Sequence, residues 1–118
     1  MNIITKNDLG TISIPEDLFT LLAGYAAIEN YGIIGMAAKN ASDSFVELFT
    51  KDNLKKGVKV TIISENEVDV DLHVMLQYGV SLPAVAENAR DNVKYRLEEL
   101  TGVKVRCVNI FVEGIRVQ

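Results

Sequence analysis

The sequence is poor in the residues on which disulfides and many catalytic sites depend. It contains one cysteine, one histidine, two prolines and no tryptophan in 118 residues. A single cysteine cannot form an intrachain disulfide, which favours a reducing compartment. No apolar run approaches the about 20 residues needed to span a bilayer, and the start of the chain lacks the basic and apolar regions of a signal peptide. We therefore expect a cytoplasmic protein.

Positive charge is also scarce. The chain has 12 Lys and Arg against 16 Asp and Glu, a net charge of −4. Generic binding to nucleic acid or anionic lipid is disfavoured, because both require a basic surface. Motifs of P-loop enzymes, serine hydrolases and zinc proteases are missing as well. The hydrophobic share of 48% is ordinary, so we expect one domain over residues 1–118, with residues 1–9 as a loosely ordered lead-in.

The most regular pattern is a period of two over residues 68–77. Apolar and more polar residues alternate along this segment, which predicts a strand with one buried and one polar face. Residues 58–62 alternate in the same way, so the two segments predict an antiparallel hairpin. The apolar residues of the longer strand are Val68, Val70, Leu72, Val74 and Leu76.

The turn of this hairpin is predicted from the requirement that the two apolar faces coincide. A two-residue turn sets Val60 opposite Asp71, whereas a three-residue turn over residues 65–67 sets Val60 opposite Leu72. We therefore predict the three-residue turn. Its left-handed residue would be Asn66 or Glu67.

A helical period follows this hairpin. Apolar residues recur every three or four positions over residues 82–100, which predicts a helix of about five turns, with Ser81 as its N-cap and Gly102 at its end. A last strand then completes a β-α-β crossover. The phase of its alternation changes near Cys107, which indicates either a β-bulge or partial cover of both faces. The apolar helix positions are Leu82, Val85, Ala86, Ala89, Val93, Leu97 and Leu100.

The first half of the chain predicts a shorter version of the same alternation of elements. Residues 11–14 read as a strand and Pro15 presets the first turn of a helix. Residues 33–37 read as a second strand, and a short helix follows near Phe45, Leu48 and Phe49. The expected apolar face of the first helix is Leu18, Leu21, Leu22, Tyr25 and Ile28, with Ala23, Gly24, Ala26 and Ala27 allowing close approach.

The predicted fold class is therefore α/β, as an α+β two-layer sandwich. The order of elements is β-α-β-(short α)-β-β-α-β, with both long helices on one face of a mixed sheet of about five strands. The other face of the sheet would carry Asp69, Asp71, His73 and Met75.

The order and spacing of several short segments carry a family resemblance. They are residues 29–36 (ENYGIIGM), residues 57–60 (GVKV), residues 70–74 (VDLHV) with Tyr78-Gly79, residues 101–105 (TGVKV), and residues 108–114 (VNIFVEG). From Gly10 to about Arg116 the chain resembles the alkaline-shock family of envelope stress response proteins of Gram-positive bacteria, as a short member.

The resemblance implies a cytoplasmic protein without known catalysis. It implies action at the inner face of the membrane through a membrane-embedded protein partner, in cell-envelope homeostasis. Short members are also linked to a dihydroxyacetone-kinase-like gene of fatty acid metabolism. The family offers no catalytic residues and no cofactor to transfer to this chain.

The polar face of the longest strand offers the first candidate site. Asp69, Asp71 and His73 are competent metal ligands, but alternate residues of a strand lie about 6.6–6.8 Å apart, which is long for three ligands of one ion. A solvated or partner-facing surface is the better interpretation, with Lys59 opposite His73 and Thr61 opposite Asp71. The predicted interaction face is Lys59, Thr61, Asp69, Asp71, His73 and Met75.

Two further motifs have structural explanations that we prefer. Residues 32–35 match the GxxG pattern with which KH domains clamp nucleic acid, but the two central residues are isoleucines and the surroundings are not basic. Cys107 lies in an apolar strand, which favours a buried and unreactive thiol over a nucleophile.

These patterns predict a non-enzymatic domain that binds protein, self-associates, and lies peripheral to the membrane through an envelope-associated partner. No cofactor, metal, nucleic acid or direct membrane insertion is expected. The alternative is a module that binds a small ligand or regulates a fatty-acid-linked metabolic enzyme. A predominantly apolar pocket beneath Tyr25, Tyr31 and Phe45 would favour that alternative.

Overall fold

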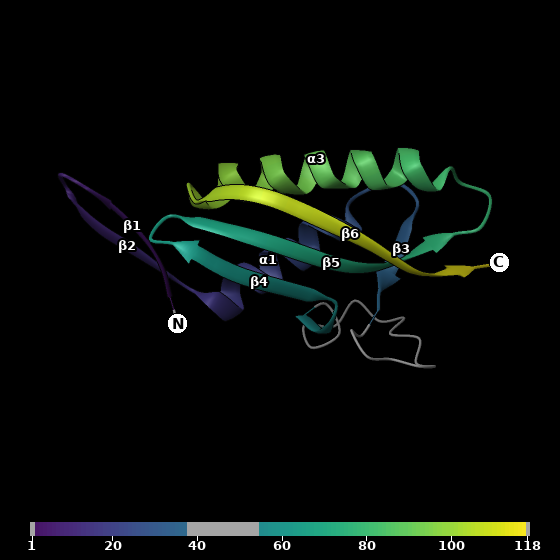
Figure 1. The fold of residues 1–118 in the computed structure, drawn as a ribbon, viewed down its shortest axis with the longest axis horizontal. Helices are drawn as coiled ribbons and strands as arrows, with labels where there is room; N and C mark the ends of the chain where they lie inside the picture. Colours follow the sequence, from purple (N-terminus) through teal and green to yellow (C-terminus); the bar gives the residue numbers. More distant parts are fainter. Residues whose placement is uncertain (1, 38–54, 118) are drawn as a thin grey trace.

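The structure is a computed structural model that describes residues 2–37 and 55–117. In this part of the chain two long helices and six strands form an α+β arrangement with two separate sheets (Figure 1). In chain order the elements are β1 (Asn2–Asn7), β2 (Gly10–Pro15), α1 (Glu16–Ile28), β3 (Ile33–Met36), β4 (Val58–Ser64), β5 (Glu67–Gln77), α3 (Leu82–Thr101) and β6 (Lys104–Arg116).

Strand β5 is the centre of the larger sheet. β6 pairs with it in parallel along its whole length, and β3 and β4 pair with it antiparallel, one after the other. At the junction of β3 and β4, the N–H of His73 donates to the carbonyl of Gly57 at 2.8 Å, and the His73 carbonyl accepts from Ala37 at 2.9 Å. The chain therefore leaves the sheet and returns to it at one residue of β5.

The predicted sheet of about five strands is in fact a sheet of four strands, accompanied by a separate two-stranded one, among the described residues. The strand expected at residues 11–14 exists as part of β2, but it pairs with β1 and not with the larger sheet. The short helix expected near Phe45, Leu48 and Phe49 lies outside the described residues.

The expected loose lead-in at residues 1–9 is wrong for residues 2–7, which form β1. This strand pairs with β2 from Asn2↔Pro15 to Asn7↔Gly10, and the hairpin projects from one end of the molecule (Figure 1). Its base is fixed, because Ile3 is fully buried and the Thr5 hydroxyl donates to the Asn66 side chain at 2.9 Å. Backbone pairing and one buried isoleucine thus order a segment that carries little periodic signal.

Helix α3 follows the sequence prediction closely. Its N-cap is Ser81, whose hydroxyl accepts from the Ala84 N–H at 3.4 Å, and it ends at Gly102 in a left-handed conformation. The buried residues of its apolar stripe are Val85, Ala89, Val93 and Leu97, while Leu82 and Leu100 at its ends are exposed. β5, α3 and β6 form the predicted crossover between parallel strands.

The predicted apolar face of helix α1 is correct in part, because Leu21, Leu22 and Ile28 pack against the core but are not fully buried. The small residues enter the core together with one aromatic ring, and the buried set is Phe19, Ala23, Gly24, Ala26 and Ala27. Of the face predicted to be buried, Leu18 is 46% exposed and Tyr25 41% exposed, and the other members are half-buried. The helix sits close to the sheet and to α3, where alanines fit and leucines do not.

The turn between β4 and β5 also differs from the prediction. Ser64 pairs with Glu67, which leaves a two-residue turn, and Ile63 is an extra residue in β4 that restores the alternation. Val60 therefore faces Val70 rather than Leu72. No non-glycine residue in the described ranges has a positive φ, so the left-handed residue expected in this turn is also wrong. The bulge at Ile63 brings the apolar faces of the two strands together, which the sequence prediction had attributed to a three-residue turn.

The phase change in the last strand is explained by bulges. The partner register of β6 skips Arg106 near its start and Glu113 near its end. Val105 and Val108 are both buried although they lie three residues apart, because Arg106 is the extra residue between them. Of the two explanations that the sequence left open, the β-bulge near Cys107 is correct.

Candidate interaction surface on the second face of the sheet

We define the second face as the face of the larger sheet opposite α1 and α3. Along β5, buried Val70, Leu72 and Val74 point toward the helices, so Asp69, Asp71, His73 and Met75 alternate onto the second face. In β4, Thr61 pairs with Asp69 and Lys59 with Asp71. The six predicted residues therefore share one face, although the expected pairs Lys59–His73 and Thr61–Asp71 are each displaced by two residues.

Strand β6 supplies partners for four polar residues of β5 on this face, Glu67, Asp69, Asp71 and His73. The guanidinium of Arg106 donates to both oxygens of Asp69, at 3.0 and 2.6 Å, and the amide of Asn109 donates to Asp71 at 2.8 Å. At the start of the ladder, the ammonium of Lys104 lies 3.8 Å from the Glu67 carboxylate. Glu67 and Asp69 are therefore paired with cations of β6, while Asp71 accepts a hydrogen bond from a neutral amide.

His73 is the most buried polar residue of the second face, with 9% of its surface exposed. Its Nδ1 lies 2.6 Å from Oε2 of Glu113, and its ring stacks on Phe111 with centroids 4.8 Å apart and an interplanar angle of 15°. Because both contacts come from β6, this imidazole joins the central strand β5 to the edge strand β6.

The two β6 bulges place the charges that complete this arrangement. Arg106 and Glu113 are the extra residues of the strand, and they contact Asp69 and His73 respectively. These two residues, like Asn109 and Phe111, were not identified from the sequence. The alternation of apolar residues changes phase near Cys107, but this change does not determine which β6 residue pairs with which β5 residue.

The Asp69–Arg106 pair also sets the titration of its neighbourhood. Hydrogen bonding from Arg106 lowers the pKa of Asp69, and the carboxylate in turn raises the pKa of Arg106. Partial burial, followed by a hydrogen bond with Asp69, raises the pKa of Cys107. The thiol is half-buried and is held in its neutral form, which opposes a nucleophilic role.

The three side chains considered as candidate metal ligands do not converge. Asp69, Asp71 and His73 each contact a different residue of β6. Among residues 2–37 and 55–117, no group of three or more His, Cys, Asp or Glu side chains could hold a metal ion.

The GxxG segment has a packing role in this structure. Gly32 has a φ of +92°, and a Cβ added there would lie 2.8 Å from a methyl group of Val85 in α3. Gly35 is buried in β3, where it pairs with Met75. Gly32 therefore serves the close approach of the α1–β3 connection to α3.

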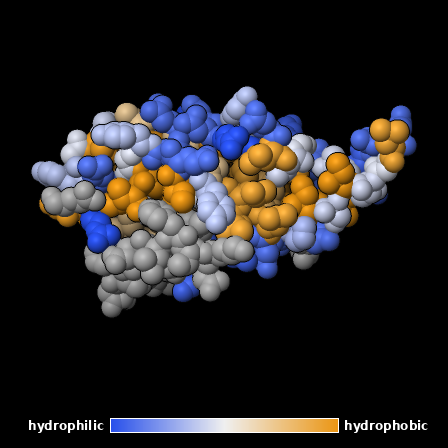
Figure 2. All heavy atoms as spheres, turned by 180° about the vertical axis from the view of Figure 1, so that it is seen from behind, coloured by the Kyte–Doolittle hydropathy of each residue, from blue (hydrophilic) through white to orange (hydrophobic). Residues whose placement is uncertain are grey.

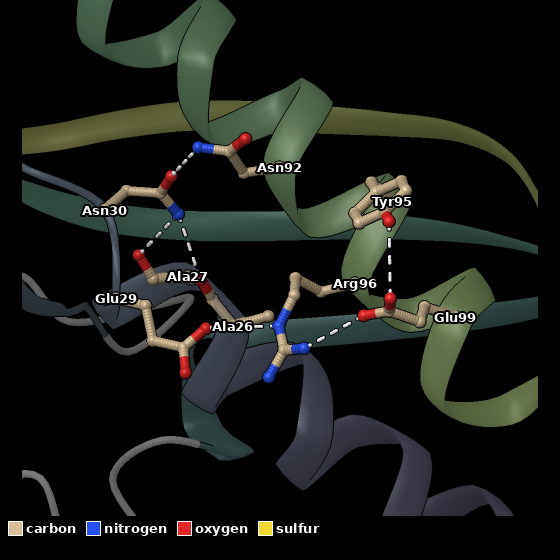
Figure 3. Close-up of polar contacts among 8 residues, drawn as sticks. All are labelled: Ala26, Ala27, Glu29, Asn30, Asn92, Tyr95, Arg96 and Glu99. Carbon is tan, nitrogen blue, oxygen red and sulfur yellow. Dashed lines mark hydrogen bonds and ion pairs between the residues drawn. The ribbon is translucent and has the colours of Figure 1, made fainter.

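Figure 3 shows a polar junction between α1 and α3 that was not predicted from the sequence. The buried side-chain amide of Asn30 donates to the carbonyls of Ala26 and Ala27 at 2.9 and 3.1 Å, and its oxygen accepts from Asn92 at 2.7 Å. Beside it, Arg96 lies 3.6 Å from Glu29. Asn30 thereby closes the C-terminus of α1 and joins it to α3.

An open depression of about 500 Å³ lies next to this junction. Its polar lining is supplied by Glu29, Ser81, Asn88 and Asn92, among others, and Tyr31 is at its edge. The small-ligand alternative expects a predominantly apolar pocket beneath Tyr25, Tyr31 and Phe45. Tyr25 does not line the depression, its walls are mixed in polarity, and Phe45 lies outside the described residues.

A comparison with protein families identifies the group to which the chain is related. The model of the alkaline shock protein 23 family, which is described by a cell envelope-related function, matches residues 4–117. The chain belongs to this family. The resemblance read from the sequence motifs is therefore confirmed. This family is not a known enzyme family.

Curated relatives give the same assignment. The chain is 36% identical over 118 residues to the uncharacterized protein YloU of Bacillus subtilis, covering 99% of this chain and 98% of the relative. It is 35% identical over 109 residues to the uncharacterized protein Spy1614 of Streptococcus pyogenes, covering 92% and 89%. No solved structure matches. In the described part of the chain, neither helix combines the length and apolar character needed to cross a membrane.

Proposed function

We propose that this chain is a non-enzymatic domain that binds protein, self-associates, and is held at the cytoplasmic side of the membrane by an envelope-associated partner. Membership of a family with a cell envelope-related function supports the part of this proposal that concerns the cell envelope. Strand β6 is the observation that carries the proposal of protein binding. It is 13 residues long, and its edge away from β5 pairs with no described strand.

Apolar side chains accompany this edge. Phe111, Val112 and Ile115 are 44%, 37% and 40% exposed in the second half of β6. A shallow groove of about 340 Å³ lies between this strand and α3, lined by Ala86, Arg90, Val108 and Ile110 among others. An open edge beside a helix is the arrangement to which an extended segment of another chain can add as a strand. The second face, with Lys59 and Thr61 exposed on β4, continues the same surface.

The test is co-purification of the tagged chain from separated membrane and soluble fractions, with mass spectrometry of the bound proteins. The proposal expects one integral membrane protein in near-stoichiometric amount. Recovery in the soluble fraction alone, with a metabolic enzyme, would instead favour the regulatory alternative.

A second measurement addresses self-association. The double variant Val112→Lys and Ile115→Lys puts charges on the β6 edge, and the mass of the particle in solution should fall to that of one chain. Leu100→Lys, on the exposed surface of α3, is the matched control and should leave the mass unchanged. If the unmodified chain is already monomeric at micromolar concentration, self-association is wrong.

A further inference from the structure

Helix α1 also carries a row of apolar side chains beside its fully buried face. Leu18 and Tyr25 are exposed, whereas Leu21, Leu22 and Ile28 are half-buried and pack against the edge of the core. We call these five residues the outer stripe. Figure 2 shows apolar side chains gathered over α1 in a band that runs toward the projecting hairpin, where Ile12 is also exposed. Contiguous apolar surface of this kind marks an interaction site more often than isolated exposed side chains do.

The charges that α1 and its C-cap residue carry are of one sign. Helix α1 contains no Lys, Arg or His, and its first turn holds Glu16 and Asp17. Glu29 follows at the other end, on the same side of the helix as Leu18 and Tyr25, since they are spaced by 11 and 4 residues. Near that end Arg96 lies between two carboxylates, 3.6 Å from Glu29 and 3.0 Å from Glu99 (Figure 3).

These charges decide between possible occupants. Two copies of the chain that pair through α1 would bring acidic ends together in either orientation, because both ends of the stripe are acidic. Anionic lipid headgroups would be repelled for the same reason. An amphipathic helix with an apolar stripe between Lys and Arg residues fits both the apolar surface and its acidic ends.

We propose that the outer stripe of α1 binds a cationic amphipathic helix of a protein partner. This inference rests on the proposed function and specifies the chemistry of that partner. Segments on the cytoplasmic side of membrane spans are rich in Lys and Arg, so an integral membrane protein can present such a helix. The stripe and the β6 edge then serve different contacts, the first with the partner and the second with another copy.

The test uses the full chain and a synthetic amphipathic peptide of about 18 residues, or five helical turns, with Leu and Ala on one side and Lys on its flanks. Isothermal titration at low and high salt measures its affinity. Two control peptides are a scramble of the same composition and a version with every Lys replaced by Glu. We expect the first peptide to bind, the scramble and the acidic peptide to bind at least about tenfold more weakly, and affinity to fall with salt.

Matched variants locate the site. Leu18→Ser with Tyr25→Ser should weaken binding by about tenfold or more, whereas Tyr95→Ser with Leu100→Ser, on exposed α3 positions, should not. Asp17→Lys with Glu29→Lys should weaken binding and reduce its dependence on salt. The control for these charges is Glu87→Lys with Asp91→Lys, also exposed on α3. All variants change exposed side chains, and circular dichroism verifies that they fold.

Several results would overturn the inference. Equal affinity for the scrambled peptide would show that binding depends on general charge attraction and not on an amphipathic helix. Unchanged affinity in the α1 variants would show that the peptide binds at another surface. A change of oligomeric state in the Leu18 and Tyr25 variant would assign the stripe to a second copy. Loss of binding to vesicles of anionic phospholipid in that variant would assign it to lipid.

The proposed function and this inference fail in different ways. If the unmodified chain recovers no membrane protein, the proposed function fails, whatever the peptide does. If the unmodified chain and the Leu18 and Tyr25 variant recover the same membrane protein equally, the function stands and the outer stripe is not its site.

Discussion

Helices α1 and α3 pack on the same sheet, but they divide their surfaces in different ways. α3 buries one apolar stripe and exposes charged residues, several of them paired, such as Lys94 with Glu98 at 3.4 Å. α1 buries alanines and a phenylalanine and exposes leucine and tyrosine. In α3 the more apolar side is the buried one. In α1 both sides are apolar, and the side with the smaller residues is the buried one.

This contrast indicates different demands on the two outer surfaces. The exposed side of α3 is mainly polar or charged. Of its exposed apolar residues, Leu82 lies at the start of the helix, and Tyr95 and Leu100 stand among charged side chains. The exposed leucine and tyrosine of α1 adjoin the half-buried Leu21, Leu22 and Ile28, and contiguous apolar surface of this kind favours contact with another molecule.

The largest expected effect compares a leucine from each helix. Leu97→Ala in α3 removes a fully buried side chain and should reduce the free energy of unfolding by about 3 kcal/mol. Leu18→Ala in α1, half-exposed, should cost about 1 kcal/mol or less. Urea denaturation measures both. Equal losses would show that the outer stripe is part of the folding core, which would contradict the contrast drawn above.

A substitution in the opposite direction tests the role of size. Ala23→Leu inserts a large side chain where α1 is fully buried and should destabilise the protein by about 1–3 kcal/mol. Ala84→Leu, on the exposed surface of α3, is the control and should be close to neutral. A stabilised Ala23 variant would mean that the core has room beneath α1, and that close approach does not explain its orientation.

The polar junction of the two helices should show a smaller effect. Asn30→Ala removes the amide that closes α1 and leaves Asn92 without its acceptor, for a loss of about 1–2 kcal/mol. Asn88→Ala, exposed on α3, controls for the change of residue type. Thermal unfolding of the single and double variants of Asn30 and Asn92 measures their coupling, and strictly additive losses would argue against a shared junction.

The smallest effect belongs to the second face, which neither helix covers. The pKa of Asp69 is lower in the folded chain than in the unfolded one, where it lies near 3.9. Its contribution to stability is therefore present above about pH 4 and is lost as pH falls through the lower folded value. Asp69→Asn should reduce the melting temperature slightly at pH 7, and the difference from the unmodified chain should shrink below about pH 4. A difference that is constant down to pH 2 would exclude this linkage.

Much of the fold could be predicted where one pattern had one interpretation. The alternation from Val68 to Leu76 correctly assigned both faces of β5, because a strand buried on one side leaves no other choice. Ser81 and Gly102 correctly bounded α3, because caps are local chemistry. The two sides of α1 could not be ranked by hydrophobicity alone, and the alanines became decisive only once their distance from the sheet was known.

The candidate surface was predictable in part for a related reason. Its six residues could be placed on one face from parity, and the structure places them there. Their partners could not be predicted, because Ile63, Arg106 and Glu113 each shift a register by one residue. A bulge keeps the apolar residues on the buried face but changes which residues of the two strands are paired. The position of a bulge is therefore hard to predict from the residues of one strand.

Ala37 and Gly57 both form backbone hydrogen bonds with His73, which bears on how the length of the chain between them can change. The segment between them begins and ends at hydrogen bonds to the two peptide groups of a single residue. Its length is therefore uncoupled from the register of β3, β4 and β5. Doubling the length of a connection adds only about 0.6 kcal/mol to the cost of closing it, so we expect the sheet to tolerate sequence inserted between these two residues.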